Sequence, residues 1–239
     1  KTIFDAVTKQ FHSGEGAIQF APEAIARSNA DILNKQELKS EFIEIYTEQG
    51  KEEAKKWINL NYGPFSEEEL NHRLTRYGLN PCGEILGNDF HCNLAEVHLN
   101  QIHPNNIEEQ KKAFKAAALS VACLLNHEFE VERYRKSREF DPIVGVSFTG
   151  LFDFFVHAFG TSWLKWWEKG RPDTEEGRIF KKREAKYLDS WRITVKQTVW
   201  EYCDKHNLRR PNRCTTVQPA GTKSLLTGAA PGWHPPKAQ

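Results

Sequence analysis

Hydrophobic residues recur every three to four positions along two long stretches of the chain, and this spacing indicates amphipathic helices. After Asn106 two glutamates occupy a first turn and apolar residues then follow, which predicts a helix of about five or six turns. The stretch 175–206 repeats the pattern and predicts a long helix. A shorter helix is expected from Ser66 toward Arg76, since glutamates follow a favourable N-cap residue. The expected buried positions are Phe114, Ala117, Ala118, Val121 and Leu125 in the first helix, and Leu188, Trp191, Val195, Val199 and Tyr202 in the second.

Short apolar runs lie between these helices. IVGVSFTG (143–150) predicts a buried strand that leads into a helix over 151–160, and CTTVQ (214–218) predicts another strand. SGEGAIQF (13–20) is typical of a Gly-rich loop that runs into a short strand. Because short strands alternate with long helices, the chain is expected to have an α/β fold with largely parallel strands.

Composition adds few constraints. The chain has 239 residues, 39% of them hydrophobic, which suffices for one sizeable core, so residues 1–239 are expected to form a single domain. The 33 basic and 32 acidic residues are mixed along the chain, so no basic face suggests a nucleic acid or a membrane surface as partner. No apolar run reaches the roughly 18 residues of a membrane span and no signal peptide is evident, so the cytoplasm is the expected location. Met is absent and the first residue is Lys, which suggests a piece of a longer protein or half of a split one.

The five cysteines are too few and too irregularly spaced for a disulfide scaffold, so any redox role would be catalytic. They are Cys82, Cys92, Cys123, Cys203 and Cys214. Structural zinc usually takes cysteine pairs two to four residues apart, and this chain has no CxxC. Cys82, His91, Cys92 and His98 share no such spacing, which argues against zinc.

The segment 80–97, NPCGEILGNDFHCNLAEV, leaves three interpretations open. Its two cysteines could be small buried hydrophobes, the commonest role of a free cysteine. A cysteine–histidine nucleophile is also compatible, although it leaves Cys92 and Glu84 without a role. Finally, Cys82 and Glu84 are two residues apart and would point to the same side of an extended loop, where a thiol and a carboxylate could reach one ligand. Cys92 could then return on an adjacent strand after a break at LGND.

PAGTKSLLTG (219–228) is a second candidate site. Gly221 would let the backbone approach a ligand, and the amides and side chains of Thr222, Lys223 and Ser224 could hold a phosphate at a helix N-terminus. It is not a P-loop, because the GxxxxGK[ST] spacing is missing.

Together, NPCGE, CNLAE, GVSFTGL and PAGTKSLLTGAAPGWHPP resemble the catalytic subunit of ribonucleotide reductase, most closely the adenosylcobalamin-dependent (class II) type. The four motifs lie within residues 80–236 in the order found in the family, while residues 1–79 match only loosely through SGEGAIQF. The resemblance implies part of a ten-stranded α/β barrel with the active cysteine on an internal loop. It implies thiyl-radical reduction of ribonucleotides, most closely ribonucleoside triphosphates, to 2′-deoxyribonucleotides for DNA synthesis, with adenosylcobalamin as cofactor.

The same resemblance implies a role for each matching residue. Cys82 corresponds to the thiyl radical that removes hydrogen from C3′ of the ribose, and Glu84 to the general base for the 3′-hydroxyl. Asn80 corresponds to an amide that hydrogen-bonds the substrate, and Cys92 to one member of the dithiol that reduces C2′. The implied phosphate-binding residues are Pro219, Ala220, Gly221, Thr222, Lys223 and Ser224.

The resemblance also implies missing parts. In the family the partner of Cys92 lies on an earlier strand, but residues 1–79 contain no cysteine. Cys123, Cys203 and Cys214 are interpreted as core residues. The expected partners are therefore a ribonucleotide, a dithiol reductant such as thioredoxin, and the rest of the reductase in cis or in trans. Two alternatives remain: a fragment of a class I catalytic subunit, which needs a second radical-generating subunit, and a non-catalytic half of a split reductase that acts by assembly.

Overall fold

A computed structural model describes residues 2–14 and 18–236, which divide into two compact units. The helical unit comprises residues up to Gly78 together with Leu86–Asn88, and the α/β unit comprises Leu79–Ile85 and the residues from Asp89 onward. The two-residue strands β1 (Gly78–Leu79) and β2 (Leu86–Gly87) pair with each other. That the whole chain forms one catalytic domain stays a prediction.

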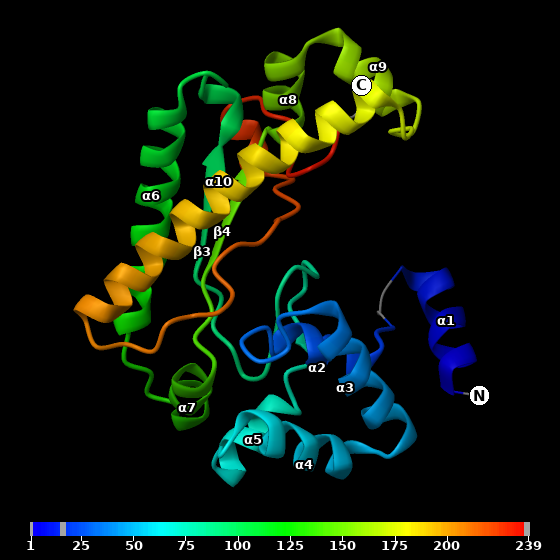
Figure 1. The fold of residues 1–239 in the computed structure, drawn as a ribbon, viewed down its shortest axis with the longest axis vertical. Helices are drawn as coiled ribbons and strands as arrows, with labels where there is room; N and C mark the ends of the chain where they lie inside the picture. The colour runs from blue at the N-terminus through cyan, green and yellow to red at the C-terminus, as the bar shows by residue number, and fades with distance from the viewer. Residues whose placement is uncertain (1, 15–17, 237–239) are drawn as a thin grey trace. The chain divides into compact units, whose positions relative to one another are not determined.

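The described residues of the helical unit form five helices (Figure 1): α1 (Thr2–Ser13), α2 (Ala21–Ser28), α3 (Gln36–Glu48), α4 (Lys51–Tyr62) and α5 (Glu67–Arg73). Its core is formed by fully buried side chains that include Ile25, Leu33, Phe42, Ile58 and Leu74. The expected helix after Ser66 is confirmed as α5, and the Ser66 hydroxyl accepts a hydrogen bond from the Glu69 amide (3.1 Å). The strand expected within 13–20 is wrong for residues 18–20, which lead directly into α2, whereas 15–17 lie outside the described residues.

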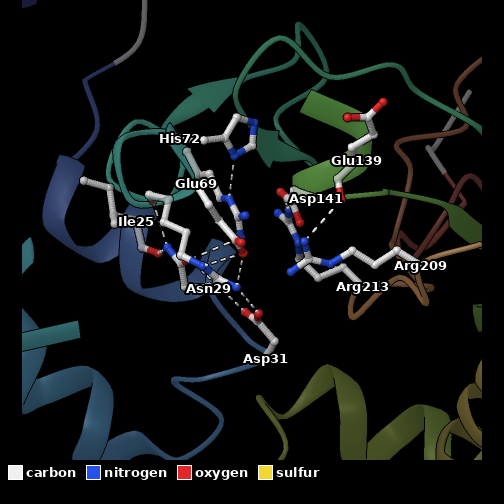
Figure 2. Close-up of polar contacts among 11 residues, drawn as sticks. Ile25, Asn29, Asp31, Glu69, His72, Glu139, Asp141, Arg209 and Arg213 are labelled. Atoms are coloured by element: carbon white, nitrogen blue, oxygen red, sulfur yellow. Dashed lines mark hydrogen bonds and ion pairs between the residues drawn. The ribbon is translucent and has the colours of Figure 1, made fainter. Parts of the chain in front are cut away.

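Arg73 is the centre of a buried polar network in this unit, and its partners Asn29, Asp31 and Glu69 are labelled in Figure 2. Its side chain is 1% exposed and donates to Asn29 Oδ1 (3.0 Å), Asp31 Oδ2 (2.8 Å) and Glu69 Oε1 (2.9 Å). Burial by itself would raise the pKa of Asp31, but the hydrogen bond and charge of Arg73 and the charge of Arg76 outweigh it and lower the pKa below its ordinary value. The network therefore fixes α5 to the segment that follows α2.

Replacing this arginine should destabilise the protein strongly. We expect Arg73→Met to lower the free energy of unfolding by about 3 kcal/mol at pH 7, because two carboxylates lose their buried partner. Urea unfolding followed by circular dichroism measures the change, and Arg27→Met is the control, since Arg27 makes an exposed ion pair with Glu23 worth less than about 1 kcal/mol. The difference in unfolding free energy between the wild type and Arg73→Met should shrink as the pH falls through the lowered pKa of Asp31, because a protonated Asp31 no longer attracts the guanidinium. Equal effects of the two substitutions would contradict this interpretation.

The α/β unit is built on two paired parallel strands, β3 (Leu94–His98) and β4 (Gly145–Thr149). The chain passes from β3 to β4 through η1 (Leu99–Gln101), α6 (Ile107–Cys123), η2 (Leu124–Asn126) and α7 (Glu132–Phe140). It leaves β4 through α8 (Leu151–Phe159), α9 (Thr161–Glu168) and α10 (Glu175–Lys205), and the later segment contains η3 (Lys223–Leu226). Figure 1 shows α6 beside the paired strands. The long helix α10 packs on α6, and the centroid of its Trp191 ring lies 6.2 Å from that of the Phe148 ring of β4. The predicted α/β class with parallel strands is confirmed.

Residues 214–216 run parallel to β4, on the edge of β4 opposite β3. Val146 bridges to Thr215, the Val146 amide donates to Cys214 O (3.0 Å), and the Thr216 amide donates to Val146 O (3.1 Å). The strand expected over 214–218 is therefore reduced to one bridge. Neighbours in space follow the chain order, with each connection made through helices, as expected of consecutive βα units.

The two faces of these strands differ in chemistry. Side chains alternate along a strand, so Ala95, Val97, Val146 and Phe148 share the face that packs on the helices. The core behind it contains the expected buried residues Phe114, Ala118, Val121 and Leu125 of the first helix region and Trp191, Val195 and Val199 of α10. Leu188, by contrast, is 38% exposed.

Candidate active site

The opposite face of β3 and β4 is polar. Glu96 is paired in register with Ser147, and His98 with Thr149. Ser147 and Thr149 are buried, and the Glu96 side chain is 3% exposed. Buried polar side chains need partners, so this face must be covered by something that can bond to it.

The Gly-rich segment after the third strand supplies several of these partners. Gln218 N donates to Ser147 Oγ (2.9 Å), and His98 Nδ1 lies 2.7 Å from Thr227 Oγ1. The Thr149 hydroxyl donates to Ala230 O (3.1 Å), and the Ala230 amide donates to Asp153 Oδ2 (2.7 Å). The segment 218–230 is thus attached to the polar face near both of its ends. Ser147 and Thr149, which bond to this segment, both belong to the GVSFTGL motif (145–151). That motif therefore contains residues that hold the Gly-rich segment in place.

Residues 219–224, which match the phosphate motif, form a turn of that segment in which Gly221, Thr222 and Lys223 are exposed, while Ala220 and Ser224 are buried. The helix expected after the glycine is the four-residue 3₁₀-helix η3, and the Ser224 amide is already bonded to Ala220 O (3.1 Å). A Cβ at Gly221 would meet no atom within 4 Å, so open space adjoins the backbone there. The Lys223 ammonium contacts the side-chain oxygen of Gln218 and lies 3.3 Å from Glu96 Oε2.

The NPCGE loop is held by its own asparagine. Asn80 Oδ1 accepts hydrogen bonds from the amides of Glu84 (3.1 Å) and Ile85 (3.0 Å), which leaves the side-chain NH₂ as the part of Asn80 suited to a ligand. The Thr216 hydroxyl donates to Glu84 O (3.1 Å) and ties this loop to the third strand. Gly145 leaves room for that contact, because a Cβ there would lie 3.0 Å from the Thr216 methyl carbon.

Cys82 and Glu84 act electrostatically on Cys92. The pKa of the Cys92 thiol is raised, first by burial of its sulfur and then by the negative charges of Glu84 and Cys82. Both cysteines are exposed as residues, yet Glu84 Oε2 is buried and accepts no hydrogen bond among the described residues. A buried carboxylate oxygen with no partner can receive a proton or a hydrogen bond from a bound molecule.

The other cysteines lie elsewhere in the α/β unit. Cys203 and Cys214 are in the apolar core, where burial raises their pKa values to about 11 and about 12, so they are poor thiolates near neutral pH, as their interpretation as core residues requires. Cys123 is exposed, so its prediction as a core residue is wrong. Among residues 2–14 and 18–236, no group of three or more His, Cys, Asp or Glu side chains could hold a metal ion.

The structure thus brings Cys82, Glu84 and Cys92 together at one end of the sheet, with Asn80 shaping the loop that carries the first two. Cys92 does not return on an adjacent strand: β2 pairs with β1, and Cys92 lies in irregular chain two residues before β3. Sequence reasoning missed Glu96, Ser147, Thr149 and Thr216. The alternation of Glu96 and His98 with Ala95 and Val97 is a strand pattern that could have revealed the first.

No family model matches the chain. Adenosylcobalamin-dependent ribonucleoside-triphosphate reductases do: the protein of Lactobacillus gasseri is 31% identical over 167 residues, and that of Lacticaseibacillus paracasei 32% over 171. Over this stretch the chain is similar to a segment of the adenosylcobalamin-dependent ribonucleoside-triphosphate reductases. The matches cover 66% of this chain and 22% of each relative, so the chain corresponds to about a fifth of these reductases.

A solved structure of a B-12 dependent (class II) ribonucleotide reductase agrees in fold. It matches 67% of this chain and 23% of its own, with a TM-score of 0.51 and 24% sequence identity. The resemblance expected from the four sequence motifs is therefore confirmed.

Among the described residues, none of the helices has the length and apolar character needed to cross a bilayer.

Proposed function

We propose that this chain is the catalytic segment of an adenosylcobalamin-dependent ribonucleotide reductase, which converts ribonucleoside triphosphates to 2′-deoxyribonucleotides for DNA synthesis. The observation that carries the proposal is the grouping of two exposed thiols with one partly buried carboxylate at the start of β3. Relatives named as ribonucleoside-triphosphate reductases support the substrate class.

The reaction assigns one step to each group. A thiyl radical on Cys82 takes the hydrogen atom from C3′, and Glu84 takes the proton of the 3′-hydroxyl, which assists departure of the 2′-hydroxyl as water. A dithiol that includes Cys92 supplies two electrons and two protons and becomes a disulfide: one proton leaves in the water and one hydrogen reaches C2′, while Glu84 returns its proton to the 3′-oxygen. Cys82 finally returns its hydrogen atom to C3′. The raised pKa of Cys92 keeps this thiol protonated near neutral pH, so it can deliver hydrogen.

Nucleotide binding would extend along β3. Cys92 lies just before β3 and Glu96 in the middle of that strand, so we place the thiols and the Lys223 loop at separate points along β3. We assign the ribose to the place beside the thiols, with the Asn80 NH₂ as a donor to the substrate. We assign the phosphates to the place beside Gly221, Thr222 and Lys223.

The residues around Cys82 fit a radical source that arrives from outside the segment. Cys82 is exposed, and a Cβ on neighbouring Gly83 would meet no atom within 4 Å, so a bulky group has room beside the thiol. Adenosylcobalamin would supply the oxidising radical, while the protein positions the thiol and the substrate. Relatives named for this cofactor favour it over the second subunit of class I enzymes.

The complete fold we propose is the ten-stranded α/β barrel. The strands β3, β4 and 214–216 follow one another in chain order, as consecutive strands of a barrel do. Hollows of about 580 Å³ beside β3 and about 620 Å³ beside residues 215–217 border the two outer strands. We assign these places to further βα units, which the rest of the reductase supplies in cis or in trans.

The partners follow from this assignment. The partner cysteine of Cys92 would come from the remaining parts of the enzyme, because Cys203 and Cys214 are buried in the core. A dithiol reductant such as thioredoxin would restore the pair after each turnover, and the cytoplasm is the location we propose. A non-catalytic half of a split reductase, which acts only by assembly, is the second candidate.

Dependence on the cofactor tests the proposal. The native protein that carries this sequence should reduce CTP to dCTP with dithiothreitol only when adenosylcobalamin is added, and the isolated 239 residues should sustain no turnover. Product is measured by chromatography without oxygen, with and without the cofactor. Reduction that instead requires oxygen and a second protein would identify a class I enzyme, and nucleotide binding without reduction would favour the assembly role.

A further inference from the structure

Glu96 is a buried acid that none of the assigned catalytic steps uses. It lies in the middle of β3, its side chain is 3% exposed, and neither carboxylate oxygen has a hydrogen-bond partner among the described residues. Burying a charged carboxylate lowers the stability of the folded protein unless a positive charge compensates it. The positive group nearest to it is the ammonium of Lys223, 3.3 Å from Oε2.

Lys223 comes from the 219–224 turn of the Gly-rich segment, and half of its side chain is exposed. Its ammonium has three donors. The Gln218 side-chain oxygen takes one, and Glu96 attracts the ammonium from the strand below. The remaining donor is free to face a ligand over the open side of the turn, where a Cβ added to Gly221 would meet no atom within 4 Å.

We propose that Glu96 is a positioning residue, which holds the Lys223 ammonium over the polar face so that it meets the terminal phosphates of the nucleotide. This inference rests on the proposed function, because it assigns the phosphates to the 219–224 turn. A lysine on a flexible four-carbon chain loses conformational freedom when it binds an anion, and an ion pair formed beforehand reduces that loss. The negative charge beside the lysine also keeps the net charge of the empty site low.

Direct binding of tripolyphosphate to the native protein, measured by titration calorimetry, tests this role. We expect Glu96→Gln to weaken tripolyphosphate binding about tenfold and to raise the KM for CTP similarly, with kcat within about twofold. Lys223→Met should weaken binding at least as much. The double variant should bind no more weakly than Lys223→Met, because Glu96 acts through the lysine. Glu201→Gln, which removes the same charge from the exposed surface of α10, is the matched control.

A thermal denaturation series separates positioning from a merely structural role. Lys223→Met leaves the Glu96 carboxylate without its counter-ion and should lower Tm, and adding Glu96→Gln should restore it. If Glu96→Gln leaves tripolyphosphate affinity unchanged while Lys223→Met reduces it, the positioning role is wrong and the phosphate site stands. If the two effects add in full, the two residues act independently and the proposal is also wrong. If the wild type binds no tripolyphosphate, the proposed phosphate site itself fails, and the role of Glu96 fails with it.

Discussion

Replacing Cys82 with serine should abolish nucleotide reduction and leave substrate binding nearly intact. Serine has almost the same size as cysteine, but its hydroxyl does not form the radical that the reaction needs. We expect dCTP formation in the native protein to fall by more than about a thousandfold, to the background of the assay. The affinity for CTP should change by less than about twofold, since no hydrogen bond of the Asn80-capped loop depends on the thiol. Chromatographic product assays and equilibrium binding measure the two quantities.

Cys123→Ser is the matched control for that substitution. Cys123 is also an exposed thiol in the same unit, but it lies at the end of α6. Its replacement should leave turnover unchanged. Normal reduction by Cys82→Ser would disprove the radical assignment, whereas loss of both turnover and CTP binding would indicate a binding role for Cys82.

The helices of the α/β unit were largely predictable, because their signals are local. Asn106 caps α6 by accepting a hydrogen bond from the Glu109 amide (3.2 Å), as the acids after it suggest. Even the error at Cys123 was avoidable. Cys123 follows the buried Phe114 by nine residues, which at 100° per residue places it about 180° away, on the exposed side of the helix.

The site was predictable only where a motif marked it. Cys82, Glu84 and Cys92 stand in two short motifs, but the contact between Thr216 and Glu84 joins residues 132 positions apart. The pairing of Glu96 with Lys223 likewise depends on how the Gly-rich segment folds back over β3. Such contacts follow from the order of parallel strands, which periodicity alone does not determine. The length of the strand at 214–218 was overestimated, because the apolar pattern does not show how many residues find a strand partner. In the structure this segment pairs through a single bridge, between Thr215 and Val146.

Replacing Glu84 with glutamine should lower kcat for CTP reduction by about 10²- to 10⁴-fold, the usual contribution of a general base. Glutamine keeps the shape of the side chain but does not accept the 3′-hydroxyl proton. The buried Oε2 atom has no partner in the described structure, so the substitution breaks no internal hydrogen bond there, and CTP affinity should change little. Single-turnover assays separate the chemical step from binding.

The same variant has a second readout that does not require turnover. Because the charge of Glu84 helps to raise the pKa of Cys92, its removal should lower that pKa and increase the thiolate fraction near pH 8. Iodoacetamide should therefore modify Cys92 faster in Glu84→Gln than in the wild type, as mass spectrometry of the modified peptide would show, while Glu201→Gln leaves the rate unchanged. If Glu84→Gln slows CTP reduction but leaves the alkylation rate of Cys92 unchanged, Glu84 acts on the substrate and not through Cys92. Faster alkylation with normal turnover would place the carboxylate beside the thiol and remove it from the role of base.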